Sequence, residues 1–348
     1  MRLVERLKRW LRLRSGAEQA PLRRTRGPVD HIVILDGTMS TLEPGCETNA
    51  GLVYKLLAEQ PEGLSLYYEP GIQWHNWRSA RDVAQGRGTN RLIRRAYGFL
   101  ASRYRPGDRI ILMGYSRGAF AVRSLAGIID RIGLLEPQHA TVSNIRQIYR
   151  HYEAGGDSAV AKKFAEIYCL PDVKIEMIGV WDTVKALGLP VPLLWRLTES
   201  AYAFHNHQLG KCICHGYQAL AMDETRDAFR PVLWDCPPGW VGDIEQVWFK
   251  GSHGDIGGQL GMFQKARPLA NIPLVWMLGN LERRGITLPA GWRGRYQQDV
   301  SAPSVGMNRG WGMMFLARRR RMIGHDMSET IHPTAEDHQP KGRIVTAS

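Results

Sequence analysis

The sequence has no long hydrophobic run and few cysteines. No apolar stretch approaches the roughly 18 consecutive residues of a transmembrane helix, which predicts that the chain is not an integral membrane protein. The five cysteines are an odd number scattered over 348 residues, which favours reduced thiols in a cytoplasm over a disulfide framework. Cys212 and Cys214 could share one face of a strand, but no second ligand pair stands at a spacing that suits a metal ion. Strand packing is therefore the favoured interpretation, and no metal is expected.

The first 28 residues lack the apolar core and the small-residue cleavage site of a secretory signal peptide. They hold nine Arg or Lys and two Glu, in a chain whose formal net charge is +13. Apolar residues recur there at helical spacing: Leu3, Val4, Leu7, Trp10 and Leu11. Such a basic amphipathic segment can contact an anionic membrane surface or dock as a solvated terminal helix, and the sequence leaves both open. No nucleic-acid recognition motif accompanies the charge, so no nucleic acid partner is expected. We expect a cytoplasmic protein, with peripheral membrane contact through residues 1–28 or export without a cleaved signal peptide as alternatives.

After a linker over residues 21–28, short apolar runs alternate with helical patterns, and no internal repeat is visible. The expected strands are residues 31–35, 64–68, 109–113, 174–181 and 245–250. The expected helices are residues 49–60, 88–105, 119–132, 141–154, 158–168 and 272–284. Strands separated by helices predict an α/β fold, with a mostly parallel central sheet and helices on both faces.

The predicted organisation is a basic segment over residues 1–28, a catalytic domain over residues 29–335 and a weakly ordered tail over residues 336–348. The run of four arginines at residues 318–321 is interpreted as a solvated face.

The strongest local signal is a serine motif between an expected strand and an expected helix. An apolar run from residue 109 leads into Gly-Tyr-Ser-Arg-Gly at residues 114–118, and a helical pattern follows at once. A sharp strand-to-helix turn would expose Ser116, while Gly114 and Gly118 would let neighbouring backbone pass close by. The five-residue pattern alone is weak, since a tight turn between buried elements could also carry it. The flanking strand and helix favour Ser116 as a nucleophile.

A serine nucleophile needs a histidine base, and the base needs an acid that orients it. In parallel sheets, functional residues gather at the carboxyl ends of strands. Asp182 follows the expected strand at 174–181, and His253 follows the one at 245–250 in a glycine-rich stretch that is interpreted as a functional loop. The order Ser116, Asp182, His253 is the nucleophile–acid–base order of α/β-hydrolases. Asp130 and Asp255 are alternatives for the acid, because a strand-end aspartate can also cap a helix.

An acyl-transfer site also needs donors for the oxyanion. The backbone N–H of Arg117, next to the nucleophile, is one candidate. The turn Asp36-Gly37-Thr38 after the first expected strand is the candidate for the other. Asp36 could anchor that turn or contact a cation, and the sequence leaves both open.

Several blocks, in one order, resemble the α/β-hydrolase family that supplies the catalytic domain of the class-one type VI secretion lipase effectors. The blocks are Leu-Asp-Gly-Thr at 35–38, Tyr-Tyr-Glu-Pro-Gly at 67–71, Gly-Tyr-Ser-Arg-Gly-Ala-Phe at 114–120, Gly-Val-Trp-Asp-Thr-Val at 179–184, Ala-Leu-Ala-Met-Asp-Glu-Thr-Arg at 219–226 and Trp-Phe-Lys-Gly-Ser-His-Gly-Asp-Ile-Gly-Gly at 248–258. The similarity covers roughly residues 30–335. The chain departs from many members at Met39-Ser40, where they carry an aromatic residue and an asparagine, and the large additional membrane-binding region of the effectors is not expected here.

The resemblance implies a Ser-Asp-His hydrolase of carboxylic esters, with phospholipids as the substrates of the secreted members and with no cofactor. Ser116 and His253 carry over onto matching motifs, and Asp182 is the natural acid. Glu224 and Arg226 are family-like, and a buried ion pair explains them at least as well as catalysis does.

Two further segments could select the substrate. Residues 71–90 carry Trp74 and Trp77, and residues 186–197 form an apolar stretch that is interpreted either as a lid or as core packing. The leading hypothesis is an esterase that cleaves lipid or small ester substrates through an acyl-enzyme. The alternative is a membrane-surface or partner-binding module on a hydrolase scaffold with little catalysis.

Overall fold

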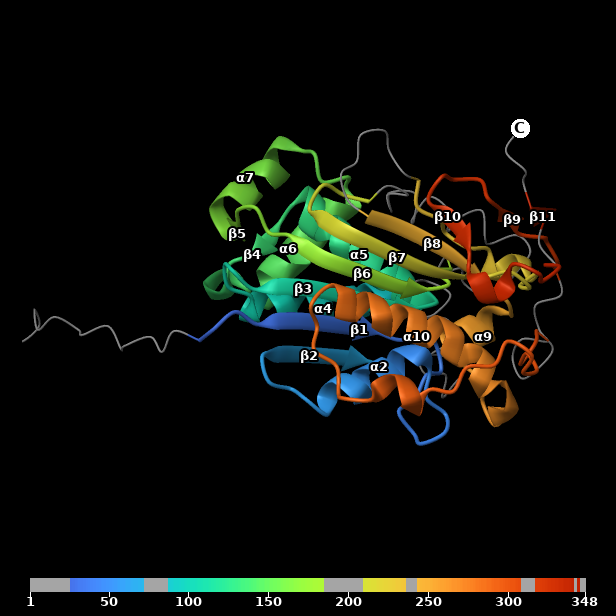
Figure 1. The fold of residues 1–348 in the computed structure, drawn as a ribbon. Helices are drawn as coiled ribbons and strands as arrows, with labels where there is room; N and C mark the ends of the chain where they lie inside the picture. Colours follow the sequence, from blue (N-terminus) through green and yellow to red (C-terminus); the bar gives the residue numbers. More distant parts are fainter. Residues whose placement is uncertain are drawn as a thin grey trace, which may run out of the picture.

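The centre of the molecule is a seven-stranded β-sheet in the strand order β10-β8-β7-β6-β3-β1-β2 (Figure 1). The computed structural model describes residues 26–71, 87–184, 209–235, 243–307, 317–340 and 343–344. The strands are β1 (Asp30–Leu35), β2 (Leu64–Glu69), β3 (Arg109–Tyr115), β6 (Ile175–Trp181), β7 (Ile213–Ala221), β8 (Asp243–Phe249) and β10 (Glu329–Ile331). Each described pairing within this sheet is parallel, which confirms the predicted α/β fold.

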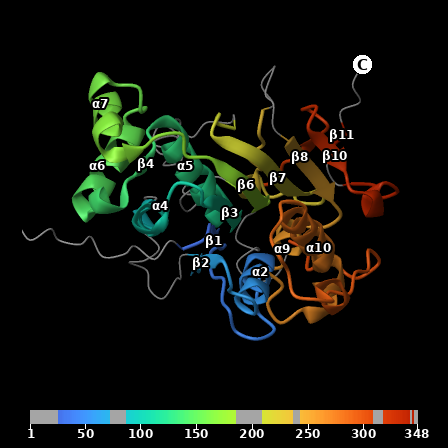
Figure 2. The ribbon, with the colours of Figure 1, turned by 60° about the vertical axis from the view of Figure 1, so that its left-hand side comes forward.

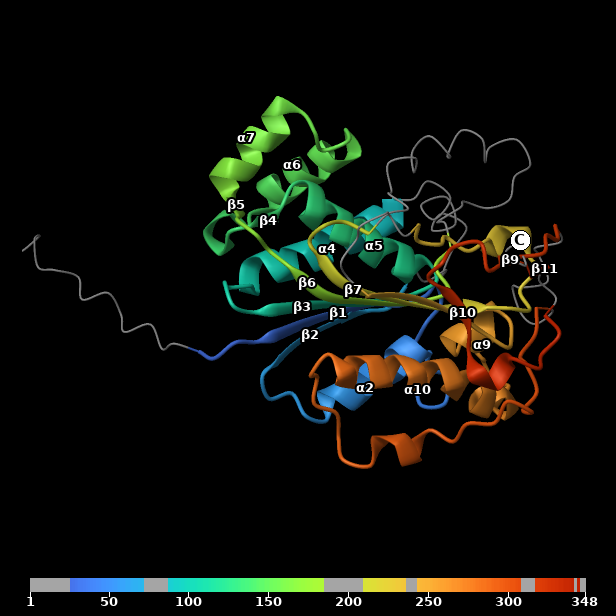
Figure 3. The same cartoon turned by 45° about the horizontal axis from the view of Figure 1, so that its top comes forward.

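Helices cover both faces of the sheet. Figure 3 shows α2 (Asn49–Ala58) and α10 (Arg267–Arg283) on one side of the sheet and α4 (Arg87–Arg103), α5 (Arg117–Arg131), α6 (Val142–Glu153) and α7 (Ala159–Tyr168) on the other. Figure 2 separates the same two groups, and the short helix α9 (His253–Gly257) lies with α10. The described residues also form two separate two-stranded sheets: β4 (Leu134–Leu135) pairs with β5 (Cys169–Leu170), and β9 (Met322–Ile323) pairs with β11 (Arg343–Ile344).

The core is divided by the alternation of side chains along each strand. In β1, Val33 and Leu35 pack among α4 and α5, whereas Ile32 and Ile34 pack among α2 and α10. A strand that is buried on both faces needs apolar residues at successive positions, which explains the continuous apolar runs of β1 and β3. Most of the helices and strands expected from the sequence are present within a few residues of their expected bounds.

The order in which strands join the sheet reverses at β1, because β2 pairs with one side of β1 and β3, which comes later in the chain, pairs with the other side. After β1, the chain enters α2 on one face, and after β3 it enters α5 on the opposite face. Open α/β sheets bind ligands beyond the carboxyl ends of two such strands. Asp36 and Ser116 are the residues that directly follow these strands.

The sequence did not reveal strand β7, which the polar pattern before residue 245 concealed. Gln218 lies in the middle of β7 and is fully buried, but its amide is satisfied by contacts with Thr183, Val232 and Gln246. A strand whose polar residue is paired inside the sheet has no clean apolar signature, which is why it was missed.

Several predicted features lie outside the described residues. These are the basic segment up to residue 25, the tryptophan-bearing stretch after residue 71 and the apolar stretch at 186–197. In the part of the chain that the structure describes, no helix combines the length and the apolarity needed to cross a membrane.

Candidate active site

Ser116 occupies a strained turn between β3 and α5. Its backbone has φ 57° and ψ −119°, a conformation that a residue with a side chain rarely adopts. Two glycines make the turn possible. A Cβ on Gly114 would lie 2.7 Å from the carbonyl oxygen of Gly118, and a Cβ on Gly118 would lie 2.0 Å from the carbonyl oxygen of Leu35. The turn therefore has the geometry of the nucleophile elbow that the sequence motif predicted.

The structure brings Ser116, His253 and Asp182 together in series. Nε2 of His253 lies 2.9 Å from Oγ of Ser116, and Nδ1 of His253 lies 2.5 Å from Oδ2 of Asp182. All three residues are buried, with exposed fractions of 6% for Ser116, 4% for His253 and 0% for Asp182. Ser116 follows β3, Asp182 follows β6 and His253 follows β8, so all three lie at the carboxyl ends of the parallel strands. The imidazole that donates from Nδ1 to Asp182 has a free lone pair at Nε2 for the serine proton.

The two alternative acids make other contacts. Asp130, near the end of α5, accepts a hydrogen bond from the backbone N–H of Cys212 at 2.9 Å. Asp255 accepts hydrogen bonds from the backbone N–H groups of Ser252 and Val305. Both carboxylates thus hold backbone in place, while Asp182 contacts the imidazole.

His253 is the first residue of the one-turn helix α9, and the expectation of a loop was wrong at this point. Ser252 and Asp255 form a capping box that starts the helix, and Gly258 ends it at a φ of 71°. Glycine-rich sequences are typical of loops, but here Ser252 and Asp255 satisfy N–H groups at the start of a helix.

Arg321 forms a buried ion pair with the Asp182 carboxylate. Its Nη1 donates to Oδ1 of Asp182 at 2.6 Å, and its Nη2 donates to Oδ2 at 2.9 Å. The same guanidinium donates to the backbone oxygens of Ala221 and Phe229. Arg321 is only 5% exposed, so the interpretation of the arginine run as a solvated face was wrong for this residue. Arg318, Arg319 and Arg320 are exposed as expected.

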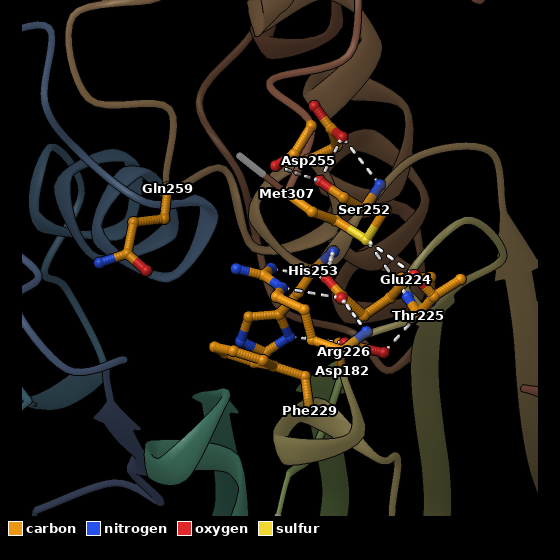
Figure 4. A network of polar contacts seen from close by, with 12 residues as sticks. Asp182, Glu224, Thr225, Arg226, Phe229, Ser252, His253, Asp255, Gln259 and Met307 are labelled. Carbon is orange, nitrogen blue, oxygen red and sulfur yellow. Dashed lines mark hydrogen bonds and ion pairs between the residues drawn. The ribbon is translucent and has the colours of Figure 1, made fainter. Parts of the chain in front are cut away.

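A second buried ion pair adjoins His253 (Figure 4). Glu224 accepts hydrogen bonds from Arg226 through both of its carboxylate oxygens and accepts the backbone N–H of His253 at 3.1 Å. The Arg226 guanidinium lies 4.1 Å above the ring of Phe229, whose ring centre is 4.7 Å from that of His253. These contacts make Glu224 and Arg226 supports of the histidine, in line with the ion-pair interpretation of the two residues.

Tyr115 connects the histidine to the turn after β1. Its ring centre is 4.9 Å from that of His253, and its hydroxyl donates to the backbone oxygen of His253 at 3.2 Å. A Cβ on Gly37 or Gly257 would lie within 2.5 Å of the tyrosine ring. Tyr115 was not expected in the site, because its position before Ser116 gave no sign that its ring lies between the turn after β1 and helix α9.

The electrostatics of the site favour an ionised acid and a neutral base. Burial by itself favours a neutral Asp182, but the charge of Arg321 and the hydrogen bonds from His253 and Arg321 outweigh it, so the pKa of Asp182 is well below its ordinary value. The pKa of His253 is also lowered, because burial disfavours the imidazolium more than Asp182 favours it. Near neutral pH the imidazole can therefore accept a proton from Ser116.

The turn after β1 lies at the same edge of the sheet as Ser116. The N–H of Gly37, an expected oxyanion donor, donates to the Asp36 carboxylate at 2.6 Å, and the carbonyl of Thr38 accepts from Gln259 at 2.7 Å. The Thr38 hydroxyl is buried and has no hydrogen-bond partner among the described residues. The N–H of Arg117, at the first position of α5, has no acceptor within its own helix. Within the part of the chain that the structure describes, the Thr38 hydroxyl and the Arg117 N–H are thus two candidate donors for the oxyanion. Burial lowers the pKa of the Arg117 guanidinium to about 10.

Asp36 anchors this turn. Its Oδ2 accepts the hydroxyl of Thr48 at 2.6 Å and that of Tyr68 at 2.7 Å. Burial raises the pKa of Asp36, although the hydrogen bonds that it accepts act in the opposite direction. Of the two roles left open by the sequence, its contacts are those of an anchor. Among the described residues, no cluster of three or more His, Cys, Asp or Glu side chains is suited to a metal ion.

The chain is similar to a known protein family, to a curated yeast protein and to a solved structure. A family model described as the catalytic domain of the T6SS Tle1-like phospholipase effectors matches residues 30–280. An uncharacterised protein of Saccharomyces cerevisiae is 29% identical over 232 residues, which cover 60% of this chain and 33% of the yeast protein. Among solved structures, an uncharacterised protein from Pseudomonas aeruginosa matches with a TM-score of 0.44 and 15% identity, over 78% of this chain and 49% of the other.

The chain thus spans about a third of the curated relative that it matches and about half of the solved chain. The family model, by contrast, covers well over half of this chain and includes each of Ser116, Asp182 and His253. The chain belongs to the family of Tle1-like phospholipase effector catalytic domains.

Proposed function

We propose that this protein is a serine hydrolase that cleaves carboxylic esters of lipids, phospholipids among them, through an acyl-enzyme. The observation that carries the proposal is the contact series from Ser116 through His253 to Asp182 at the strand ends of a parallel sheet. The family supports a lipid-ester hydrolase, and the geometry supports the residues to which we assign the chemistry.

In the proposed mechanism, His253 removes the hydroxyl proton as Ser116 attacks the acyl carbonyl carbon. Asp182 stabilises the imidazolium that forms and holds the ring in the orientation that this transfer needs. The negative charge on the carbonyl oxygen is stabilised by the N–H of Arg117 and by Thr38, and one such donor typically contributes about 10²-fold to 10³-fold in kcat. The imidazolium then protonates the departing alcohol, and a water molecule activated by His253 releases the acid.

The test combines active-site labelling with hydrolysis. Wild type, Ser116→Ala and Ser102→Ala are treated with a fluorophosphonate probe and assayed against a panel of p-nitrophenyl esters and phospholipid vesicles. Ser102 is an exposed serine on α4 and serves as the matched control. We expect labelling and turnover in wild type and Ser102→Ala, and a loss of at least about 10³-fold in Ser116→Ala.

Equal turnover by Ser116→Ala and wild type would contradict the assignment of the nucleophile. A wild-type protein that neither reacts with the probe nor cleaves any ester would contradict the hydrolase and leave the alternative, a binding module on this scaffold. Hydrolysis of small esters but not of vesicles would limit the proposal to soluble substrates.

A further inference from the structure

Arg321 reaches the proposed catalytic residues from a part of the chain beyond the family match, which ends at residue 280. The segment at residues 317–340 is fixed along the strand ends by backbone contacts. Arg319 donates its N–H to the carbonyl of Thr225 at 2.7 Å, and Asp227 donates its N–H to the carbonyl of Ala317 at 3.0 Å. Further along, β10 pairs in parallel with β8 and forms an edge of the central sheet.

The contacts of Asp182 show what Arg321 does. The Oδ1 of Asp182 accepts from Arg321 and from the backbone N–H of Ala221, which lies at 3.1 Å. Its Oδ2 accepts from Arg321 and from His253. The two parallel N–H···O bonds fix the carboxylate plane as well as its position, since a guanidinium matches a carboxylate in a planar, two-point contact. One oxygen is thereby presented to the imidazole.

We propose that Arg321 is a positioning residue of this hydrolase, which orients Asp182 against His253 and supplies the positive charge that balances the carboxylates around the imidazole. The inference rests on the proposed function and extends it to a segment outside the family match. Arg321 contacts no substrate atom in this scheme and acts only through Asp182.

The charge balance gives the proposal a measurable signature. In the described part of the chain, the charged groups facing His253 are the carboxylates of Asp182 and Glu224 and the guanidiniums of Arg226 and Arg321, while the phenol of Tyr115 adds a neutral group. Removing Arg321 leaves an excess negative charge beside the imidazole and stabilises its protonated form. The acid limb of the pH–rate profile should therefore move to higher pH, by about one unit for a charge at this range.

The experiment compares Arg321→Met, Arg321→Lys and the exposed control Arg320→Met with wild type. The readouts are the fluorophosphonate labelling rate and kcat/KM for a p-nitrophenyl ester, both followed from pH 4 to pH 9, with circular dichroism as the check of folding. For Arg321→Met we expect a loss of about 10-fold to 100-fold at the pH plateau, together with the upward shift of the acid limb. Arg321→Lys keeps the charge but loses the two-point contact, so its acid limb should stay at the wild-type position while its plateau rate falls. Arg320→Met should match wild type in both.

A merely structural role for Arg321 would lower the amount of active protein without moving the acid limb. Non-additivity provides a second test: in an Asp182→Asn background, replacing Arg321 by Met or Lys should cause no further loss of rate, because the residue through which it acts is already impaired. If Arg321→Met does not fold, the Lys variant and its combination with Asp182→Asn still decide the question.

An unshifted acid limb and an undiminished plateau in Arg321→Met would overturn the inference and leave the hydrolase intact. Full additivity of the two substitutions would overturn it as well. The absence of labelling and turnover in wild type would overturn the proposed function and this inference with it.

Discussion

Replacing Asp182 by Asn tests the proposed catalytic relay most directly. Among the described residues, the Asp182 carboxylate accepts hydrogen bonds from four N–H donors, two on each oxygen. Asn supplies one acceptor oxygen and one NH₂ group, so two of the four donors must face an NH₂. The oxygen is best placed at the Oδ1 position, because the N–H of Ala221 is fixed in the backbone. The NH₂ group then faces His253 and Arg321.

The consequence for His253 is a change of tautomer. An NH₂ group at the Oδ2 position donates to Nδ1, which places the imidazole proton on Nε2 and removes the lone pair that accepts the proton of Ser116. We expect kcat to fall by about 10⁴-fold near neutral pH. Arg321 also loses its ion partner while buried, so the free energy of unfolding should fall by about 3 kcal/mol.

The assay is steady-state hydrolysis of a p-nitrophenyl ester, with urea unfolding for the stability. Asp130→Asn is the matched control, since Asp130 was one of the two alternative acids and its carboxylate accepts the backbone N–H of Cys212. It should keep its activity within about 10-fold. Retention of a tenth or more of wild-type kcat by Asp182→Asn, or an equal loss in Asp130→Asn, would refute the reasoning.

Three other outcomes follow from the site. The acid limb of kcat/KM should lie below about pH 6.5, because burial lowers the pKa of His253 and the base is active only when neutral; a pH profile with its limb above 7 would contradict this sign. Gly118→Ala should lower labelling of the serine by at least about 10-fold, because its Cβ would lie 2.0 Å from the carbonyl oxygen of Leu35 and must displace the turn; unchanged labelling kinetics would show that the elbow tolerates a side chain. If the buried, unpaired Thr38 hydroxyl stabilises the oxyanion, Thr38→Val should lower kcat by about 10-fold to 100-fold with little change in the free energy of unfolding. Thr38→Ser keeps a hydroxyl and should retain the wild-type kcat. Equal kcat values for wild type and both variants would show that the oxyanion donors are backbone N–H groups instead.

The parts of the site that could be predicted from the sequence are those written in local patterns. The elbow around Ser116 is a strand, a five-residue turn and a helix in direct succession, so its geometry follows from neighbouring residues. Asp182 and His253 could be placed because each follows an apolar strand, and parallel strands bring their carboxyl ends to one edge. The acid stayed ambiguous with Asp130 and Asp255, since carboxylates at the ends of strands and helices have the same appearance in a sequence whether they cap backbone or orient an imidazole.

The parts that could not be predicted depend on contacts between distant segments. Arg321 follows three arginines that are exposed, and nothing in the run distinguishes the one that is buried. Arg321 is buried because β10 pairs with β8 and because its guanidinium forms an ion pair with the Asp182 carboxylate. Gln218 concealed β7 for the same reason, because its partners are distant in the sequence: Thr183 follows β6, and Gln246 lies in β8.

The arrangement of charge around His253 explains why these distant residues belong together. Two carboxylates, Asp182 and Glu224, are buried beside the imidazole, and each is met by a guanidinium, from Arg321 and Arg226 respectively. An isolated buried carboxylate would take up a proton or destabilise the fold, so an ionised acid next to a neutral base requires a partner cation in the same dry site. The family match ends before Arg321, whose charge is one of the causes that lower the pKa of Asp182. We therefore expect the smallest unit that can hold the proposed relay in its working protonation state to extend from β1 to β10, which pairs with β8, and to be longer than the region that the family model matches.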